Sequence, residues 1–150
     1  MRDTDYVMRE ATHKLEIRET RWRGGKQTAQ RYRDLEIYQL AHRLAVEVHS
    51  VSLSLPRVEA FEEASQVRRA TKSVSANIVE GFGRRRYKAA FIKLLTYAHA
   101  SGDETQEHLR LLWECSSLSE ESFRRLDSEY NTLGRMLNGF IRAVDAEHLT

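Results

Sequence analysis

The sequence predicts an all-α protein, an antiparallel up-down-up-down four-helix bundle that follows a charged N-terminal arm. Apolar residues recur at alternating steps of three and four through most of residues 34–150, the spacing that places them on one face of a helix. No segment alternates apolar and polar residues over a useful length, as a half-buried strand would. The 150 residues contain one proline and seven glycines, so few positions interrupt long helices.

The first two helices are predicted on either side of Pro56. The first spans about residues 34–55. Its apolar repeat consists of Ile37, Ala41, Leu44, Val48, Val51 and Leu55. The second runs through about residues 58–79, and Gly81 and Gly83 are expected to interrupt it. Its weaker repeat consists of Val67, Thr71, Val74 and Ile78.

The third helix is predicted from about Arg86 to Cys115. Its repeat has small residues at its centre and consists of Phe91, Leu95, Ala98, Gly102, Thr105, Leu109 and Leu112. Ser119 is a good N-cap for a fourth helix, because Glu120 and Glu121 follow where negative charge meets the positive end of the helix dipole. The fourth repeat consists of Phe123, Leu126, Tyr130, Leu133, Leu137, Phe140 and Val144. Since the connections are short, successive helices run antiparallel.

Two parts account for the chain: a charged arm over residues 1–33 and the bundle over residues 34–150. The arm contains the segment RWRGGK and no sustained apolar repeat. Cys115 is the single cysteine, which excludes an intramolecular disulfide and a multi-cysteine zinc site. No stretch approaches the ~18 apolar residues of a membrane span, and no signal peptide is recognisable. We therefore expect a cytoplasmic protein that contacts no membrane.

The charge is segregated along the chain, although it nearly cancels to +2. Residues 68–93 carry eight Lys and Arg against one acidic residue, whereas residues 94–150 carry five against ten. The basic block consists of Arg68, Arg69, Lys72, Arg84, Arg85, Arg86, Lys88 and Lys93. It brackets the predicted turn between the second and third helices. Such a cluster attracts a polyanion by neutralising phosphates and releasing counterions, so these residues are candidates for binding RNA or DNA.

Two aromatic residues, Phe82 and Tyr87, lie within the basic block as candidate platforms for unpaired bases. Two other interpretations of the block stay open. Its cations could pair with the acidic first and fourth helices, in the same subunit or a neighbouring one, or they could form an ordinary solvated face.

Polar residues follow one face of the second helix and one face of the third. On the second helix they are Ser73, Asn77 and Glu80, and on the third they are Ser101 and Glu104. If the two lines meet, they form a hydrogen-bonded network that sets helix register and oligomeric state. An active site is the alternative, but no nucleophile pairs with a base.

Other catalytic and metal patterns are incomplete. A ferritin-like di-metal site requires Glu-x-x-His twice with two further carboxylates, and the chain does not complete that set, so we expect no metal. Arg43 and His49 form the R-x5-H string of helical HEPN ribonucleases, but this string is short and common. The segment GFGRRR lacks the ending of a phosphate-binding loop, and no cofactor is expected.

Three stretches carry a resemblance to a known family. They are DLEIYQLAHRLAVEVH at 34–49, SQVRRATKSVSANIVEGFGRRR at 65–86, and the pattern of Ala98, Ser101 and Glu104. Together they resemble the four-helix-bundle family of 23S rRNA intervening-sequence proteins, which includes the accessory variability proteins of diversity-generating retroelements. The chain departs from the family pattern at Glu63, Lys72 and Ser75, where leucine, valine and proline are usual.

The resemblance implies an antiparallel bundle that assembles as a ring-shaped homopentamer and has no known enzymatic activity. It also implies a basic scaffold that binds a reverse transcriptase and nucleic acid. From the residues and the resemblance together, the function expected is that of a non-enzymatic oligomeric accessory protein that presents a basic surface to RNA or DNA, or to a nucleic-acid enzyme. The alternatives are a protein-only interaction module and, less favoured, a HEPN-like ribonuclease.

Overall fold

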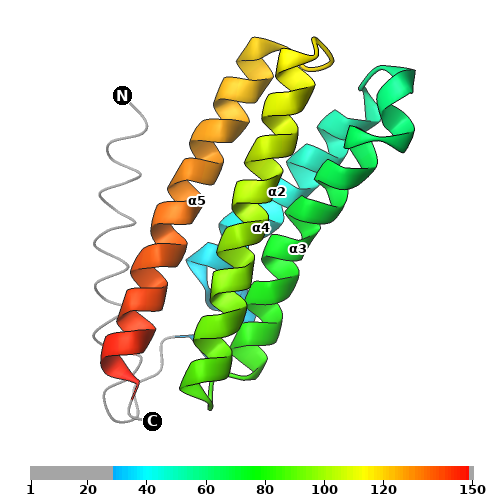
Figure 1. Cartoon of the computed structure of the whole chain (residues 1–150). Helices are drawn as coiled ribbons and strands as arrows, with labels where there is room; N and C mark the ends of the chain where they lie inside the picture. Colours follow the sequence, from blue (N-terminus) through cyan, green and yellow to red (C-terminus); the bar gives the residue numbers. More distant parts are fainter. Residues whose placement is uncertain (1–28, 149–150) are drawn as a thin grey trace.

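The structure is a computed structural model that describes residues 29–148. Within these residues, four α-helices run in alternating directions and lie side by side as a bundle (Figure 1). They are α2 (Glu36–Leu53), α3 (Glu63–Gly83), α4 (Lys88–Glu114) and α5 (Glu120–Glu147), with short 3-10 segments η1 (Tyr32–Asp34) and η2 (Arg57–Phe61). The described residues contain no strand, and the predicted fold class is confirmed. Most of the predicted arm, residues 1–28, lies outside the described residues.

The apolar repeats read from the sequence form one continuous core. Its largest fully buried side chains come from all four helices and the residue before α2, and include Leu35, Leu44, Ile78, Phe91, Leu95, Leu109, Leu126 and Leu137. α3 and α4 make the most extensive contact in the bundle, and α2 and α5 one of the smallest. α2 lies behind α4 in Figure 1, where it closes the bundle from that side.

The second helix begins later than the sequence predicted. Residues 57–61 form η2, and the chain then bends at Glu62, where φ is −113° and ψ is −107°. α3 begins only at Glu63. The side chain of Glu59 explains part of this arrangement, because it is buried and its Oε1 accepts a hydrogen bond from Ser117 Oγ at 2.7 Å. η2 therefore fastens the α4–α5 loop instead of extending α3.

Gly81 does not interrupt α3, contrary to the prediction. The helix continues through it to Gly83, and Gly81 is buried where α3 approaches α4. A Cβ added at Gly81 would lie 3.2 Å from the Cβ of Leu94 and 3.4 Å from a ring carbon of Phe91. The absence of a side chain thus lets the two helices pack closely near the turn that joins them.

Three polar residues from three helices meet inside the core. Thr71 of α3, Thr105 of α4 and Tyr130 of α5 are all buried. The hydroxyls of Thr71 and Tyr130 are hydrogen-bonded to each other, and Thr105 Oγ1 donates to the Ser101 carbonyl at 2.8 Å. Burial raises the pKa of Tyr130 to about 12. The three hydroxyls occupy core positions that an apolar side chain would otherwise fill. Their hydrogen bonds offset the free-energy cost of burying them.

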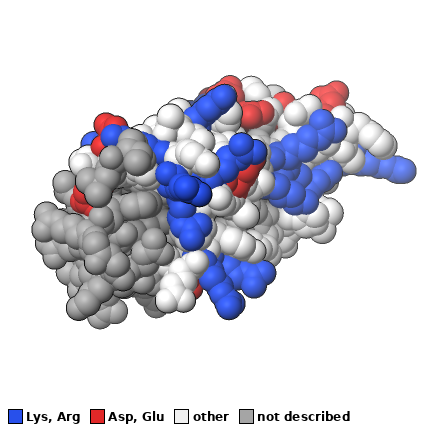
Figure 2. Space-filling model, turned by 90° about the horizontal axis from the view of Figure 1, so that it is seen from below, with Lys and Arg blue, Asp and Glu red and all other residues white. Residues whose placement is uncertain are grey.

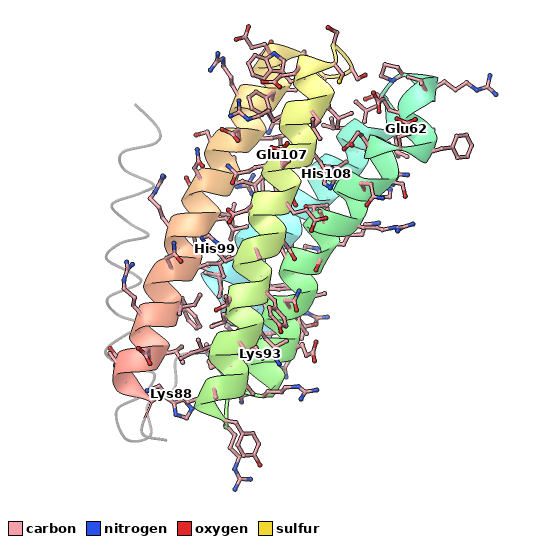
Figure 3. All side chains as sticks on the ribbon, viewed as in Figure 1. Glu62, Lys88, Lys93, His99, Glu107 and His108 are labelled. Atoms are coloured by element: carbon pink, nitrogen blue, oxygen red, sulfur yellow. The ribbon has the colours of Figure 1, made fainter. Side chains whose placement is uncertain are left out.

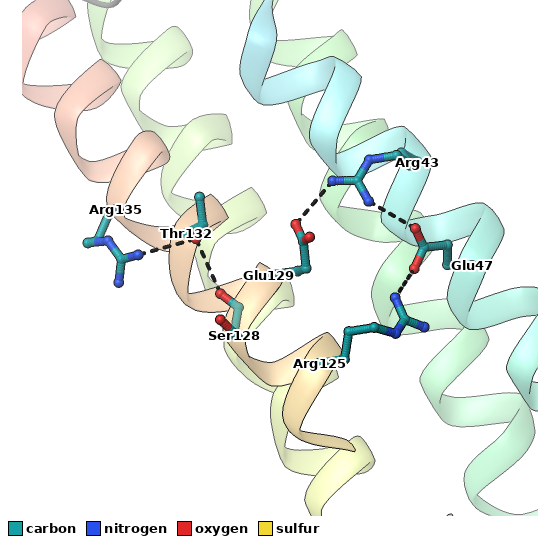
Figure 4. A network of polar contacts seen from close by, with 7 residues as sticks. All are labelled: Arg43, Glu47, Arg125, Ser128, Glu129, Thr132 and Arg135. Atoms are coloured by element: carbon teal, nitrogen blue, oxygen red, sulfur yellow. Dashed lines mark hydrogen bonds and ion pairs between the residues drawn. The ribbon is translucent and has the colours of Figure 1, made fainter. Parts of the chain in front are cut away.

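An ion-pair network joins α2 to α5 (Figure 4). Arg43 pairs with Glu47 at 2.9 Å and with Glu129 at 3.0 Å, and Arg125 pairs with Glu47 at 2.6 Å. Partial burial alone would raise the pKa of Glu47, but the hydrogen bonds from Arg125 and Arg43 outweigh it and hold that pKa below its ordinary value. The network bridges two helices that otherwise contact each other little.

Candidate nucleic-acid interface

The basic corner is the turn between α3 and α4 together with the first turns of α4. We use this name for Arg84, Arg85, Arg86, Lys88 and Lys93. Because α3 ends at Gly83 and α4 begins at Lys88, the three arginines fall in the turn itself. Seen from this end of the bundle, Lys and Arg side chains gather over the surface with few acidic side chains among them (Figure 2).

Two helix ends of opposite polarity meet at the basic corner. The arginines follow the C-terminus of α3, where the helix dipole favours positive charge. Lys88 instead occupies the first turn of α4, where a cation is unfavourable. α4 has no acidic residue in its first turn, and its N-cap Tyr87 makes no side-chain capping hydrogen bond. α5 is the contrast, because Ser119 accepts a hydrogen bond from the Ser122 amide and two glutamates follow, as predicted. The start of α4 therefore retains an electrostatic attraction for anions.

The cations of the corner are only partly compensated within the protein. Arg84 pairs with Glu80 at 3.3 Å, and Lys88 pairs with Asp145 of α5 at 3.3 Å. Both pairs are largely open to solvent on at least one side. Within residues 29–148, neither Arg86 nor Lys93 has an acidic partner in ion-pair distance. The corner thus keeps a net positive charge.

The remaining predicted cations, Arg68, Arg69 and Lys72, lie apart from the corner. They belong to the first half of α3, and Lys72 is twelve residues before Arg84, about 18 Å along the helix. Arg68 is half-buried and donates a hydrogen bond from Nη1 to Ser52 Oγ at 2.9 Å, so it joins α3 to α2. Arg69 and Lys72 are exposed. The basic block is therefore two groups on one helix and its turn, and the corner is the denser of them.

The two aromatic candidates differ in accessibility. Phe82 is only 4% exposed, and the guanidinium of Arg85 covers its ring at 4.0 Å. The prediction that Phe82 offers a stacking surface is wrong, because this ring belongs to the core. Tyr87 is 64% exposed and remains available. A third aromatic, Tyr97, was not among the predicted site residues. It is half exposed, and Lys93 Nζ lies 5.7 Å from the centre of its ring.

The two predicted polar lines meet in part. Asn77 donates from Nδ2 to the Ser73 carbonyl at 2.9 Å and to Ser73 Oγ at 3.0 Å, and Ser101 Oγ donates to Ser73 Oγ at 3.0 Å across the α3–α4 contact. Glu80 instead pairs with an arginine of the corner. Glu104 lies beside His108, at 3.5 Å from its Nε2. A role of the network in oligomeric state stays a prediction.

Comparison with known proteins identifies the family. The family model described as 23S rRNA-intervening sequence protein matches residues 33–139. The chain belongs to this family. A solved structure with a similar fold is a protein of unknown function of the S23 ribosomal protein family from Bacteroides thetaiotaomicron, with a TM-score of 0.66 and 22% identity over 71% of this chain and 95% of that chain. A comparison with curated proteins finds no significant match.

Two histidines of α4, His99 and His108, are held in contacts with carboxylates. His108 Nδ1 lies 2.6 Å from Glu63 Oε2, so His108 connects α4 to the start of α3. His99 of α4 lies 3.3 Å from Asp103 (Figure 3). Among residues 29–148, no group of three or more His, Cys, Asp and Glu side chains is arranged to hold a metal ion.

The R-x5-H string does not converge on one point. Arg43 and His49 are six positions apart, so their side chains leave α2 about 120° apart. Arg43 is directed to α5, where it pairs with Glu129, and carboxylates raise its pKa against the opposing effect of burial. His49 lies toward another side of the helix. This family member therefore does not bring the two groups together as the ribonuclease hypothesis requires.

No helix within the described part of the chain is long and apolar enough to cross a membrane.

Proposed function

We propose that this protein is a non-enzymatic, self-associating scaffold whose basic corner binds the phosphate backbone of RNA or DNA. The observation that carries the proposal is the concentration of Arg84, Arg85, Arg86, Lys88 and Lys93 around one helix–turn–helix, with only Glu80 and Asp145 as acidic partners among the described residues. Clustered long cations neutralise several phosphates at once and release their counterions, which is the main source of sequence-independent affinity.

The start of α4 adds to this attraction. Lys88 lies at a helix N-terminus that has neither a capping side chain nor an acidic residue. A protein under selection for stability alone gains from an acid at such a position, as α5 shows with Glu120 and Glu121. Local violation of a stability rule is expected where a site has a binding role.

The partner that the proposal names is a nucleic-acid enzyme such as a reverse transcriptase, together with its RNA or DNA. This part rests on the resemblance to the accessory variability proteins of diversity-generating retroelements, and so does the homopentameric state. The basic corner supports it in one respect, because a scaffold that holds a nucleic acid for an enzyme needs contacts to backbone charge and no sequence preference. A cytoplasmic location belongs to the same proposal.

The test replaces Arg84, Arg85, Arg86 and Lys88 by alanine. We expect weaker binding to unrelated RNA and DNA sequences, and a slope of log K against log salt that is flatter by up to about 0.7 to 0.9 for each lost phosphate contact. Titrations at several salt concentrations measure both. A matched control replaces Arg57, Arg110, Arg124 and Arg135, which changes the net charge equally but leaves the corner intact.

Four outcomes separate the candidate functions. Loss confined to the corner variant supports the proposal. Equal loss in both variants shows that total charge, and not the corner, attracts the nucleic acid. If the corner variant keeps the parental affinity and salt slope, nucleic-acid binding at this site is refuted. If the corner variant instead dissociates into smaller species, its cations pair with acids of a neighbouring subunit.

A protein-only interaction module is the second candidate, and one surface favours it. Large apolar side chains are exposed on the outer side of α2 and on η2: Val46 at 58%, Leu53 at 71%, Val58 at 69% and Phe61 at 92%. Soluble single-chain proteins rarely expose such side chains together. In the scaffold proposal this surface is where copies of the chain associate, and in the protein-only alternative it is the whole function.

A further inference from the structure

A hollow opens in the surface beside the basic corner. It has a volume of about 450 Å³ and is lined by Lys88, Ala89, Ile92, Lys93 and Asp145. Four of these residues occupy the first two turns of α4, and Asp145 comes from the end of α5. Figure 3 shows Lys88 at the lower end of α4 on the side of α5, and Lys93 further up the same helix. The hollow therefore lies on the surface that the proposed function assigns to nucleic acid.

The lining suits a nucleobase better than a phosphate. Ala89 and Ile92 are apolar, and burying a phosphate against them removes its hydration without supplying hydrogen bonds. Asp145 adds a carboxylate, which repels a phosphate but accepts hydrogen bonds from the amino groups of bases. The two lysines are long enough to reach the phosphates on either side of a bound base.

The position of Asp145 also keeps one lysine in place. Its Oδ1 lies 3.3 Å from Lys88 Nζ, and the Lys88 side chain is only 28% exposed. Lys93 is exposed and makes no ion pair within residues 29–148. One cation is thus positioned beside the hollow and the other is free to follow a flexible strand.

Tyr87 provides a second surface for a base. It directly precedes Lys88, its side chain is 64% exposed, and the guanidinium of Arg86 lies 5.8 Å from the centre of its ring. An exposed tyrosine among cations is the combination that stacks bases of single strands. Tyr87 is the N-cap residue of α4, but its side chain makes no capping hydrogen bond. Its side chain therefore does not stabilise the start of the helix in this way.

We propose that the hollow receives an unpaired nucleobase and that Tyr87 stacks on a neighbouring base, so that the basic corner prefers a single strand to a duplex. This inference rests on the proposed function of the corner. In a duplex the bases are already paired and stacked, so only the phosphates are accessible to the corner. A single strand offers its base faces as well as its phosphates.

The test measures the ratio of affinities for one short RNA oligonucleotide, single-stranded and annealed to its complement. Ala89→Leu fills the hollow without a change of charge, and because Ala89 is exposed and leucine favours helices, the fold is retained. Tyr87→Ala removes the stacking ring. We expect each variant to lower the single-strand-to-duplex ratio by about fivefold or more, as loss of one stacked base does, while duplex affinity stays at the parental value.

Two matched controls keep the comparison specific. Ala100→Leu introduces the same side chain at an exposed position eleven residues further along the same side of α4, and should leave the ratio unchanged. Tyr87→Phe preserves the aromatic face and should keep the parental single-strand-to-duplex ratio. Thermal unfolding of each variant by circular dichroism verifies that the bundle is intact.

The outcomes distinguish this inference from the function on which it rests. If Ala89→Leu and Tyr87→Ala keep the parental ratio while the four-alanine corner variant loses binding to both oligonucleotides, the inference is wrong and the proposed function stands. If Ala89→Leu weakens both oligonucleotides equally, the hollow contacts phosphate and the inference is again wrong. If the parent binds neither oligonucleotide, both proposals fail.

Discussion

Tyr130 shows how a single residue couples three helices. Its ring packs near Gly102 of α4, and its hydroxyl bonds to Thr71 of α3 inside the core. Thr71 and Tyr130 both lie in the apolar repeats, and the hydroxyl of each is hydrogen-bonded to the hydroxyl of the other. Such a pair is sensitive to loss of one partner, because the group left behind stays buried without a hydrogen bond.

A double-mutant cycle at this pair tests the coupling. Tyr130→Phe and Thr71→Val should each lower the free energy of unfolding by about 1 to 3 kcal/mol, since each leaves one hydroxyl without its partner. The double variant should lose less than the sum of the two. Chemical denaturation of the four proteins measures the coupling, and strictly additive losses would show that the two hydroxyls do not depend on each other.

The same pair has a signature at high pH. The pKa of Tyr130 is raised to about 12 in the folded protein, so its neutral form stabilises the fold below the ordinary tyrosine pKa of about 10. This stability is lost as the pH rises from about 10 through about 12. The free energy of unfolding of the parent should therefore fall more steeply with pH over that range than that of Tyr130→Phe. As a control, the two proteins should show the same pH dependence of stability near neutral pH.

At the scale of the helices, α2 is joined to its two neighbours by different means. Toward α3 it contributes apolar residues and the Ser52 hydroxyl that binds Arg68. Toward α5 it has fewer contacts and the ion pairs of Arg43 and Glu47. The second side therefore responds to pH and ionic strength, which do not affect apolar packing in the same way.

Glu47→Gln tests this side of α2. The pKa of Glu47 is lowered in the folded protein, so its contribution to stability is present above its ordinary pKa and is lost as the pH falls through the lowered value. We expect Glu47→Gln to reduce stability near neutral pH by up to about 1 kcal/mol, and the difference from the parent to shrink as the pH falls below the ordinary pKa of glutamate. Thermal unfolding across pH measures it.

Glu120→Gln is the matched control for that comparison. Glu120 pairs with Arg124 four residues later on the same exposed helix face, so it joins no two helices. If it changes the acid profile as much as Glu47→Gln does, the inter-helix pairing has no special role.

The four helices could be predicted because their information is local. Each apolar repeat is visible within about twenty residues, and Ser119 carries its own capping signal. The bend at Glu62 could not be predicted, because the burial of Glu59 depends on Ser117, which is far away in the sequence. The prediction at Gly81 was wrong for a related reason. This glycine allows α3 to approach Leu94 closely, but the sequence does not distinguish such a glycine from one that ends a helix.

The candidate site was predictable to the same extent. Arg84, Arg85 and Arg86 are adjacent in the sequence and also in space. Asp145, which completes the hollow, is 57 positions beyond Lys88, and only the antiparallel return of α5 brings it there. The sequence alone does not distinguish the aromatic residues Phe82 and Tyr87. In the structure Phe82 is buried in the core, whereas Tyr87 is exposed at the surface.

On the scale of the whole molecule, charge is distributed unevenly along the bundle. The end at the α3–α4 turn is basic, whereas the α4–α5 end carries Glu114, Glu120 and Glu121. η2 lies at the α4–α5 end, where Glu59 contacts Ser117, so the exposed apolar residues of η2 and of the end of α2 are remote from the basic corner (Figure 1). Assembly through the apolar surface would therefore leave the basic corner of each subunit accessible, which a scaffold requires.

The assembly prediction follows from that exposed surface. Light scattering should give a mass well above 17.5 kDa at micromolar concentration, and Phe61→Asp should reduce it, because a charge is costly to bury in an interface. Leu111→Asp, at an exposed position on α4, should not. A parent that measures as a single chain would contradict self-association, and five subunits would be excluded by any other stable mass.

The close packing of α3 on α4 has a consequence for the order of folding. The two helices are neighbours in sequence, are joined by a four-residue turn, and make the largest contact in the bundle. Contacts between sequence neighbours require little loop closure and form early. This hairpin can therefore assemble before α5 is in place, with its arginines already positioned at the turn. A polyanion that binds the hairpin would then stabilise a folding nucleus, and would raise the refolding rate as well as the final stability.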